Sequence, residues 1–146
     1  MRRVLVIEDG TEYAEFTRLF LGSDFEVVAA QSGAEALRVA GAGSVDVLLI
    51  DLRFDRAPAG VLVGDVDATA ERLFAGDRPR ALRHLQDQQG VLILAELRQA
   101  GHVQPAVFVH EFPPRRLENL RRLYGDLRTV PTFDAAALRV ALGGEA

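Results

Sequence analysis

Short apolar runs alternate along this chain with segments whose apolar residues recur at helical spacing. Four runs have little polar alternation, as in strands buried on both faces; they cover residues 3–8, 25–30, 45–51 and 105–110. Their helical partners are at 11–22, 32–43, 90–101 and 114–125, and a weaker strand and a short helix follow at 127–131 and 134–142. Five strand–helix units predict an α/β fold, an open parallel sheet with helices on both faces.

One connection is much longer than the others. Residues 54–89 separate the third strand from its helix, where about 2–6 residues are usual. Two helical patterns lie within this segment, one at 67–76 with Asp67 as its candidate N-cap, and one that starts at Asp77. We therefore expect a helical insertion between strand three and helix three.

The whole chain, residues 1–146, is expected to form a single domain that contains this insertion. The apolar residues of the insertion are expected to bury against the sheet or the following helix, and a dimerisation or partner surface is the alternative. These residues are Leu73, Phe74, Leu82 and Leu85.

Composition narrows the classes of function. Hydrophobic residues make up 49% and charged residues 26%, as in ordinary globular proteins, and the absence of cysteine excludes disulfide and thiol chemistry. No apolar run approaches the roughly 20 residues of a membrane span. The formal net charge of −4 gives no support to nucleic-acid binding by the whole chain. We expect a cytoplasmic protein with neither a membrane nor a nucleic acid as partner.

Three acids follow two of the predicted strands. Glu8 and Asp9 end the first strand, and Asp51 ends the third. Ligands of open parallel sheets bind at the carboxyl ends of the strands, so neighbouring strands would bring the three carboxylates together. Mg²⁺ would relieve their repulsion, and such a site suits transfer of a phosphoryl group to a carboxylate. The alternative for Asp9 is a helix N-cap.

These residues carry a resemblance to a known family. The stretches "RRVLVIEDG", "FLGSDFEVVAAQSGAEALRVA" and "VDVLLIDL" resemble the receiver domain of two-component response regulators. The resemblance implies a flavodoxin-like (βα)5 doubly wound sheet with strand order 2-1-3-4-5. It also implies that Asp51 is the phosphoacceptor, with Mg²⁺ held by Glu8, Asp9, Asp51 and the backbone carbonyl of Arg53. The implied partners are a histidine kinase and a downstream effector in a phosphorelay.

Two positions depart from the family pattern. His110 stands where receivers carry the Ser or Thr that bonds the new phosphoryl group, and it could bond a phosphate, pair with an acid or simply be a satisfied strand-end residue. Val130 stands before Pro131, where receivers carry a Lys that pairs with the phosphorylated Asp. Arg128 lies two residues earlier, too far from the strand end for an easy substitution.

The predicted helix at 114–125 is basic. In receivers this helix contributes to the output face, which implies an acidic protein partner, and a solvated amphipathic helix is the alternative. The arginines concerned are Arg115, Arg116, Arg121 and Arg122.

The leading hypothesis is a non-enzymatic, receiver-like signalling domain that works through protein contacts, including a homodimer as one option. Because the sequence ends shortly after the last helix, we expect it to act without an output domain. Two alternatives remain: a phosphorylation-independent pseudo-receiver adaptor, and a small Mg²⁺-dependent phosphohydrolase with Asp51 as nucleophile. Arg53 weighs against the hydrolase, because dehalogenase-like hydrolases need an acid two residues after the nucleophile.

Overall fold

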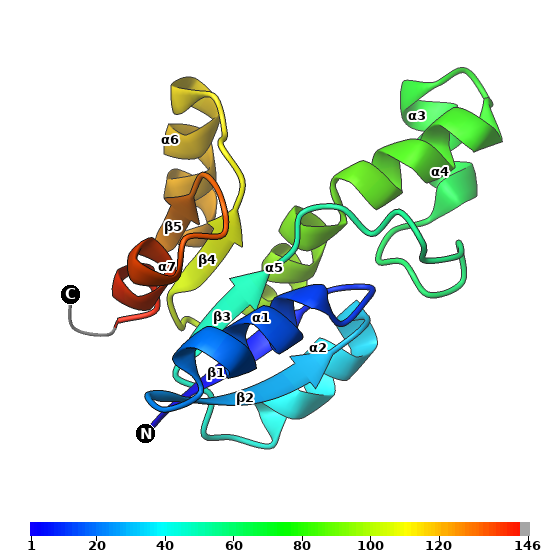
Figure 1. The fold of residues 1–146 in the computed structure, drawn as a ribbon. Helices are drawn as coiled ribbons and strands as arrows, with labels where there is room; N and C mark the ends of the chain where they lie inside the picture. Colours follow the sequence, from blue (N-terminus) through cyan, green and yellow to red (C-terminus); the bar gives the residue numbers. More distant parts are fainter. Residues whose placement is uncertain (144–146) are drawn as a thin grey trace.

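A parallel sheet of five strands forms the centre of the protein. The computed structural model describes residues 1–143. The strands are β1 (Arg2–Ile7), β2 (Phe25–Ala30), β3 (Val47–Ile50), β4 (Ala106–Val109) and β5 (Leu127–Val130), and their order in the sheet is β2-β1-β3-β4-β5 (Figure 1). The predicted flavodoxin-like (βα)5 class and its strand order 2-1-3-4-5 are confirmed.

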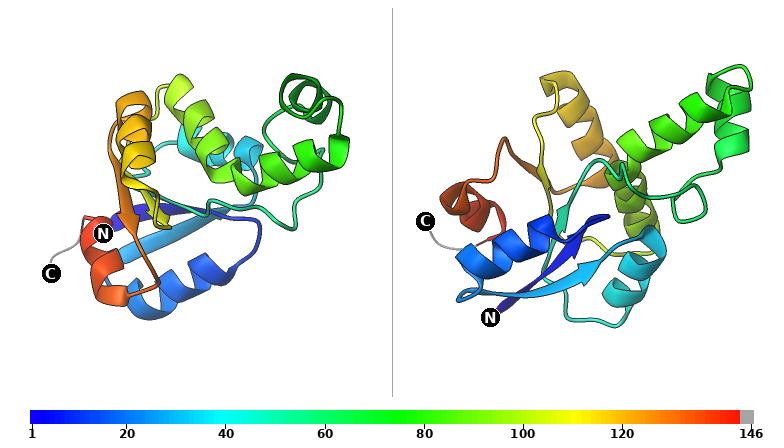
Figure 2. Two further views of the ribbon diagram at one scale, coloured as in Figure 1. Left: turned by 90° about the horizontal axis from the view of Figure 1, so that it is seen from above. Right: turned by 45° about the vertical axis from the view of Figure 1, so that its right-hand side comes forward.

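Helices cover both faces of this sheet. Successive strand residues point to opposite faces, so Val4 and Val6 pack with one helical layer, whereas Leu5 and Ile7 pack with the other. Figure 2 shows α1 (Glu12–Leu21) and α7 (Ala135–Ala141) on one side. The opposite side carries α2 (Gly33–Gly41), α5 (Gln89–Gln99) and α6 (Pro114–Tyr124). In residues 1–143, no helix combines the length and the apolar character that crossing a membrane requires.

The register of β1 and β3 places the acids of both strands at one edge. Ile7 pairs with Ile50, so Glu8 and Asp51 follow their strands at the same level. The amide of Asp51 continues the ladder by donating to the carbonyl of Ile7 at 2.9 Å. This edge is where ligands of open parallel sheets bind.

The long connection after β3 contains two helices, as expected. They are α3 (Val66–Leu73) and α4 (Arg78–Asp87), and they project beyond the sheet (Figure 1). The N-cap of α4 is Asp77, as predicted, since its carboxylate accepts from the amide of Arg80. The N-cap predicted for α3 was wrong: Asp65 caps this helix, through the amide of Ala68, and Asp67 lies in its first turn.

The insertion is attached to the domain at its base. The amide of Phe54 donates to the carbonyl of Gln86 at 2.9 Å, and only Gln88 separates α4 from α5. The buried side chain of Gln89 bonds both backbone groups of Val63, accepting from its N–H at 2.7 Å and donating to its C=O at 3.1 Å. These contacts join the start and the end of the insertion to the first turn of α5.

Only part of the insertion's apolar surface is buried. Leu85 lies in the core and Leu82 packs against it, as predicted. The prediction is wrong for Leu73, whose side chain remains 55% exposed. Phe74 packs edge-on against His84, with ring centroids 5.5 Å apart, and lies beneath the guanidinium of Arg80 rather than on the sheet.

Candidate functional site

Asp51 lies in the loop that leaves β3, with most of its carboxyl group removed from water. Its Oδ1 accepts from the phenol of Tyr13 at 3.2 Å and from the amide of Arg53 at 3.4 Å. Burial raises the pKa of Asp51 to about 6; the two hydrogen bonds oppose this effect, and the nearby charges of Asp9 and Glu8 add to it. The site therefore holds a carboxylate that loses its proton just below neutral pH.

Glu8 is fully buried and is bound to the first turn of α1. Its Oε1 accepts from the amide of Tyr13 at 3.0 Å, and its Oε2 accepts from the amide of Ala14 at 2.9 Å. Burial raises the pKa of Glu8, whereas these two amides lower it. Free N–H groups at a helix start favour a carboxylate, so Glu8 stabilises α1. A direct bond from Glu8 to a metal would require the loss of these hydrogen bonds.

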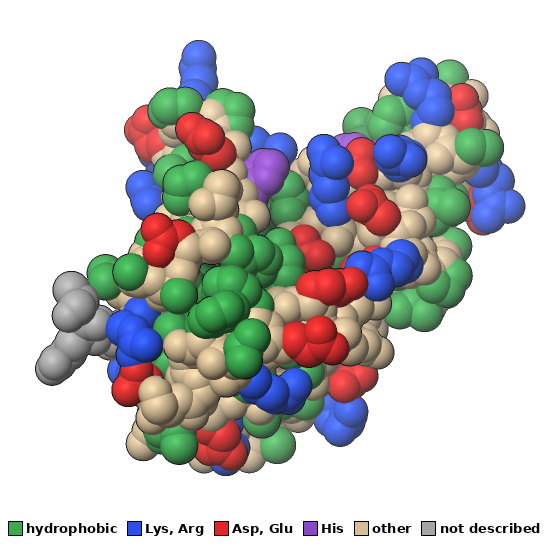
Figure 3. All heavy atoms as spheres, viewed as in Figure 1, with side chains coloured by type: hydrophobic (Ala, Val, Ile, Leu, Met, Phe, Trp, Pro, Cys, Tyr) green, Lys and Arg blue, Asp and Glu red, His purple; other side chains and the backbone are tan. Residues whose placement is uncertain are grey.

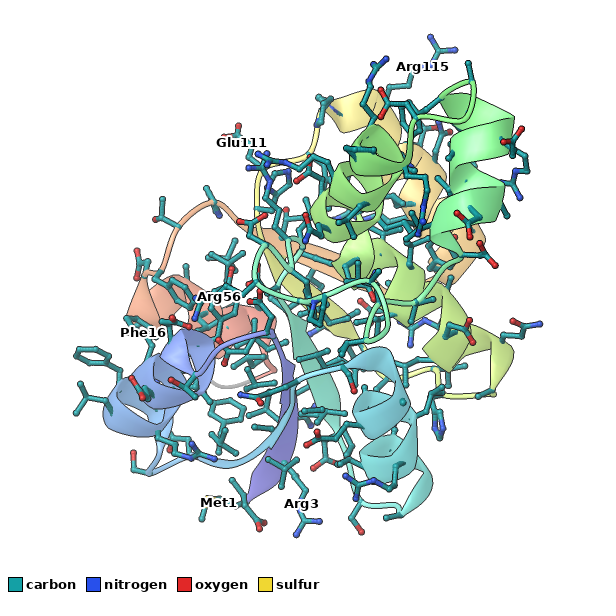
Figure 4. The ribbon with its side chains drawn as sticks, turned by 90° about the vertical axis from the view of Figure 1, so that its right-hand side faces the viewer. Met1, Arg3, Phe16, Arg56, Glu111 and Arg115 are labelled. Atoms are coloured by element: carbon teal, nitrogen blue, oxygen red, sulfur yellow. The ribbon has the colours of Figure 1, made fainter. Side chains whose placement is uncertain are left out.

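The inserted segment supplies a cation beside the acids. The amide of Arg56 donates to Oδ2 of Asp9 at 2.8 Å, and its guanidinium pairs with Oε1 of Glu12 at 2.7 Å. Glu12 chiefly, and then Asp9 and Asp51, raise the pKa of Arg56. Figure 4 shows Arg56 between the loop after β3 and the start of α1. Asp9 does not cap α1, whose N-cap position is Thr11.

The oxygen atoms at this edge of the sheet suit an Mg²⁺ ion that is bound by two carboxylates rather than three. In the described part of the chain, no three acidic, His or Cys side chains gather closely enough to hold one ion. Asp9 and Asp51 are close enough to influence each other's charge, and each has one carboxylate oxygen without a hydrogen-bond partner in residues 1–143. With the backbone carbonyl of Arg53 they offer the oxygen ligands that Mg²⁺ prefers, and water would complete its shell.

His110 follows β4 and lies near two cations, Arg53 and Arg116, and one acid, Glu111. Its ring packs edge-on against Phe112, with centroids 4.6 Å apart. Burial lowers its pKa, and the charges of Arg53 and Arg116 lower it further. At neutral pH the imidazole is therefore uncharged, and within residues 1–143 it forms no ion pair with the acids at the strand ends.

Val130 ends β5 inside the core, so no cation reaches the acids from this strand. Its side chain is buried on the side of the sheet that α1 and α7 cover. Arg128 is occupied elsewhere: its guanidinium bonds both carboxylate oxygens of Asp126 at 2.9 Å and the carbonyl of Ala141 at 2.8 Å. Arg128 therefore does not replace the lysine of receivers.

The arginines of α6 differ in their surroundings. Arg121 bonds the carbonyl of Leu127, Arg122 pairs with Glu118 one turn away, and Arg116 bonds the side chain of Gln88. Arg115 extends from the outer end of the helix (Figure 4). A hollow of about 630 Å³ lies beside this helix and is lined by β5, α7 and the Arg121 side chain.

Three residues near the acids had no role in the sequence-based site. Tyr13 and Arg56 contact the acids only because the fold brings distant parts of the chain together. For Tyr13, the helical spacing of apolar residues could have indicated a position on the inner side of α1; Arg56 had no such signal. Gly90 has a clearer signal, as a glycine at a helix start. A Cβ at this position would lie 2.3 Å from the carbonyl oxygen of Asp51, so α5 approaches β3 too closely for any side chain.

Known structures resemble the chain in fold. No family model matches it, and no curated protein matches it. It is similar to the receiver domain of the Francisella response regulator 1452, at 19% identity and a TM-score of 0.62, with 97% of this chain and 93% of that chain covered. The chain has the receiver fold.

Two further receiver structures show the same relation. Chemotaxis protein CheY4 of Vibrio cholerae is 18% identical with a TM-score of 0.64, over 97% of this chain and 96% of that chain. The response regulator TrrA of Thermotoga maritima, solved in complex with Mg²⁺-BeF, is 17% identical with a TM-score of 0.59, over 96% and 95% of the two chains. Identities this low establish the receiver fold, and the chemistry depends on this chain's own residues.

Proposed function

We propose that this protein is a receiver-like signalling domain that accepts a phosphoryl group on Asp51 and acts through protein contacts. The observation that carries the proposal is Asp51 itself, a largely buried carboxyl group at the end of β3 with its pKa raised to about 6. It lies where the sheet presents ligands, beside the acids that follow β1. A carboxylate that is ionised at neutral pH and poorly solvated is well suited to attack phosphorus.

The chain's own groups orient this nucleophile. The phenol of Tyr13 and the amide of Arg53 both donate to Oδ1 of Asp51, which leaves Oδ2 to attack. Arg56 places positive charge at the same edge. When bound by Asp9, Asp51 and the Arg53 carbonyl, Mg²⁺ would neutralise the oxygens of the transferred group. The fold of TrrA, which was solved with Mg²⁺-BeF, supports this proposal.

The expected partners are proteins, a histidine kinase as phosphodonor and an acidic effector on the face formed by α6, β5 and α7. Arg115 and Arg122 are exposed on α6, and the hollow between the helix and β5 adds apolar surface. Arg121 is held by the carbonyl of Leu127, so we expect it to support the helix rather than bind the effector directly.

Phosphorylation by a small donor tests the proposal. Protein with Mg²⁺ and acetyl phosphate should gain the mass of one phosphoryl group, and the gain should disappear in Asp51→Asn and on removal of Mg²⁺. The matched control is Asp55→Asn, because Asp55 is an exposed acid in the same loop. A wild-type protein that stays unmodified while an ordinary receiver is labelled would refute phosphorylation at Asp51.

A phosphorylation-independent adaptor is the second candidate, and Val130 and His110 favour it. The buried valine cannot form the ion pair that the lysine of receivers forms with the phosphorylated Asp, and the uncharged histidine offers only a neutral N–H donor. This candidate predicts that Asp51→Asn leaves the affinity for the partner protein unchanged. An affinity that rises only after phosphorylation would exclude it.

A further inference from the structure

An aromatic cluster connects Asp51 with the molecular surface. We define it as Tyr13, Phe16 and Phe20 of α1 together with Phe133, which precedes α7. The ring of Phe133 lies 4.5 Å from that of Tyr13, edge-on, and 4.6 Å from that of Phe16; Phe16 and Phe20 are 4.7 Å apart. Aromatic rings at these separations attract one another, so the four side chains pack as a unit.

The outer part of this aromatic cluster is exposed. Phe20 is 52% and Phe133 36% exposed, and Leu19 beside them is also open to solvent. Figure 3 shows apolar side chains gathered over α1 and the loop before α7, and Figure 4 shows Phe16 where α1 adjoins α7. A change at the inner end of the aromatic cluster therefore has a direct route to the surface.

Tyr13 is that inner end. Its ring packs against Phe133, while its hydroxyl donates to Oδ1 of Asp51 at 3.2 Å. Its backbone is held by Glu8 and by Thr17, so the main chain is fixed and the side chain is the part that can move. A hydrogen bond to a carboxylate is roughly twice as strong as one to a neutral oxygen, so this hydroxyl responds to the charge on Asp51.

Phosphorylation would change that charge. In the transfer, Oδ2 forms a bond to phosphorus as the bond from phosphorus to the donor's leaving atom breaks. The leaving atom keeps the electron pair: acetyl phosphate releases acetate, and a phosphohistidine releases an imidazole nitrogen that takes up a proton from the solvent. Oδ1 then becomes the carbonyl oxygen of a neutral acyl group, and the negative charge resides on the phosphoryl oxygens. The acceptor of the Tyr13 hydrogen bond is thereby weakened.

We propose that Tyr13 reads the charge state of Asp51 and passes it to the aromatic cluster, so that the α1–α7 face changes with the state of the site. The role in signalling rests on the proposed phosphorylation of Asp51. The coupling of Tyr13 to Asp51 does not, since any neutralisation of this carboxylate should have the same effect. Val130 is buried and His110 forms no hydrogen bond to Asp51 within residues 1–143, so the Tyr13 route replaces the two readout positions of receivers.

A single-tryptophan reporter tests this coupling, because the chain contains no Trp. Phe133→Trp places the reporter in the aromatic cluster at a position that already tolerates exposure. Neutralisation by Asp51→Asn should shift the emission maximum and increase acrylamide quenching. The packed-to-unpacked ratio should change roughly fivefold, as the change from a charge-assisted to a neutral hydrogen bond implies. Adding Tyr13→Phe, which keeps the ring and removes the hydroxyl, should abolish the response to Asp51→Asn.

The second tyrosine supplies both a control and an independent measurement. Tyr124→Phe should leave the reporter's response intact, and in the native sequence it makes Tyr13 the sole strong fluorophore. A carboxylate that accepts a hydrogen bond from a phenol quenches its fluorescence, so Asp51→Asn should brighten this variant. An equal reporter response with and without the Tyr13 hydroxyl, or emission unaffected by Asp51→Asn, overturns the inference. If Asp51→Asn gives both responses but acetyl phosphate adds no mass, the coupling stands and phosphorylation fails.

Discussion

Replacing Asp51 by asparagine should stabilise the protein at neutral pH. The pKa of its carboxyl group rises from the ordinary value of 3.8 to about 6, chiefly through burial. A group with a raised pKa binds its proton more tightly in the folded than in the unfolded protein, so its ionisation opposes folding. Asparagine keeps a carbonyl oxygen that can accept from Tyr13, and it has no charge to bury.

The size of this effect follows from the pKa difference. Above pH 6 the group is ionised in both states, and a difference of about two pKa units corresponds to at most roughly 3 kcal/mol. Because Asp51 retains some contact with solvent and the amide also loses water, we expect a gain of about 1–2 kcal/mol, or roughly 2–8 °C in Tm. Below the ordinary pKa of 3.8 the carboxyl is mostly protonated in both states, so the gain should be nearly lost at pH 3.5.

Urea and thermal unfolding followed by circular dichroism, in EDTA at pH 7.5 and at pH 3.5, measure the difference. Asp55→Asn is the control, and its exposed side chain should change the free energy of unfolding by less than about 0.5 kcal/mol. Excess Mg²⁺ should reduce the advantage of Asp51→Asn, because a bound cation favours the ionised carboxylate. A loss of stability at pH 7.5, or a gain of equal size at both pH values, would refute the reasoning.

Three further predictions concern the surroundings of Asp51. Gly90→Ala should lower the free energy of unfolding by about 1–3 kcal/mol in urea titrations, because its Cβ would overlap the Asp51 carbonyl. Gln89→Ala should lower it by about 2 kcal/mol and speed proteolysis of the inserted segment, because the backbone groups of Val63 lose a buried partner. Arg56→Gln should raise the affinity for Mg²⁺ by up to roughly fivefold in calorimetric titrations, because it removes a competing cation beside Asp9 and Glu12.

Each of these predictions has a matched control. Gly60→Ala enters open space, and Gln99→Ala removes an exposed amide at the other end of α5, so both should be nearly neutral. Arg78→Gln breaks an exposed ion pair with Asp67 in the same insertion and should leave Mg²⁺ affinity unchanged. If a variant and its control change stability or Mg²⁺ affinity equally, the physical reason given for that variant is contradicted. Weaker Mg²⁺ binding in Arg56→Gln would show that Arg56 supports the metal.

The alternation of apolar runs and helical patterns was enough to predict the sheet, because both signals are local. The N-caps of the two inserted helices could not be predicted equally well. Two acids lie at the start of α3, and the choice between Asp65 and Asp67 depends on the extended backbone at Asp65, which follows a positive φ of 108° at Gly64. Leu73 was placed wrongly because α3 packs chiefly on α4, so one of its apolar residues has no layer to cover.

The candidate site, too, could be predicted from the sequence only in part. Asp51, Glu8 and Asp9 could be predicted as strand-end acids, because a parallel sheet brings such ends together. Their actual hydrogen bonds could not, since Glu8 is bound by amides five and six residues later and Asp9 by an amide from the insertion. Tyr13 lies 38 residues from Asp51 in sequence, so no local pattern connects them.

The hydrogen bond between Phe54 and Gln86 shows that the chain leaves the domain and returns to it at one place. A segment with adjoining ends can be exchanged at little cost in loop-closure entropy, which grows only slowly with length. Residues 55–85 therefore form a unit that could be exchanged for a foreign domain with closely spaced termini, provided that the replacement restores the core contacts of Leu85 and the backbone groups of Val63 that pair with Gln89. Because this junction adjoins Gln89 and Gly90, a ligand that tightens or loosens a grafted domain would act on the backbone of Asp51, which makes the protein a scaffold for engineered sensors.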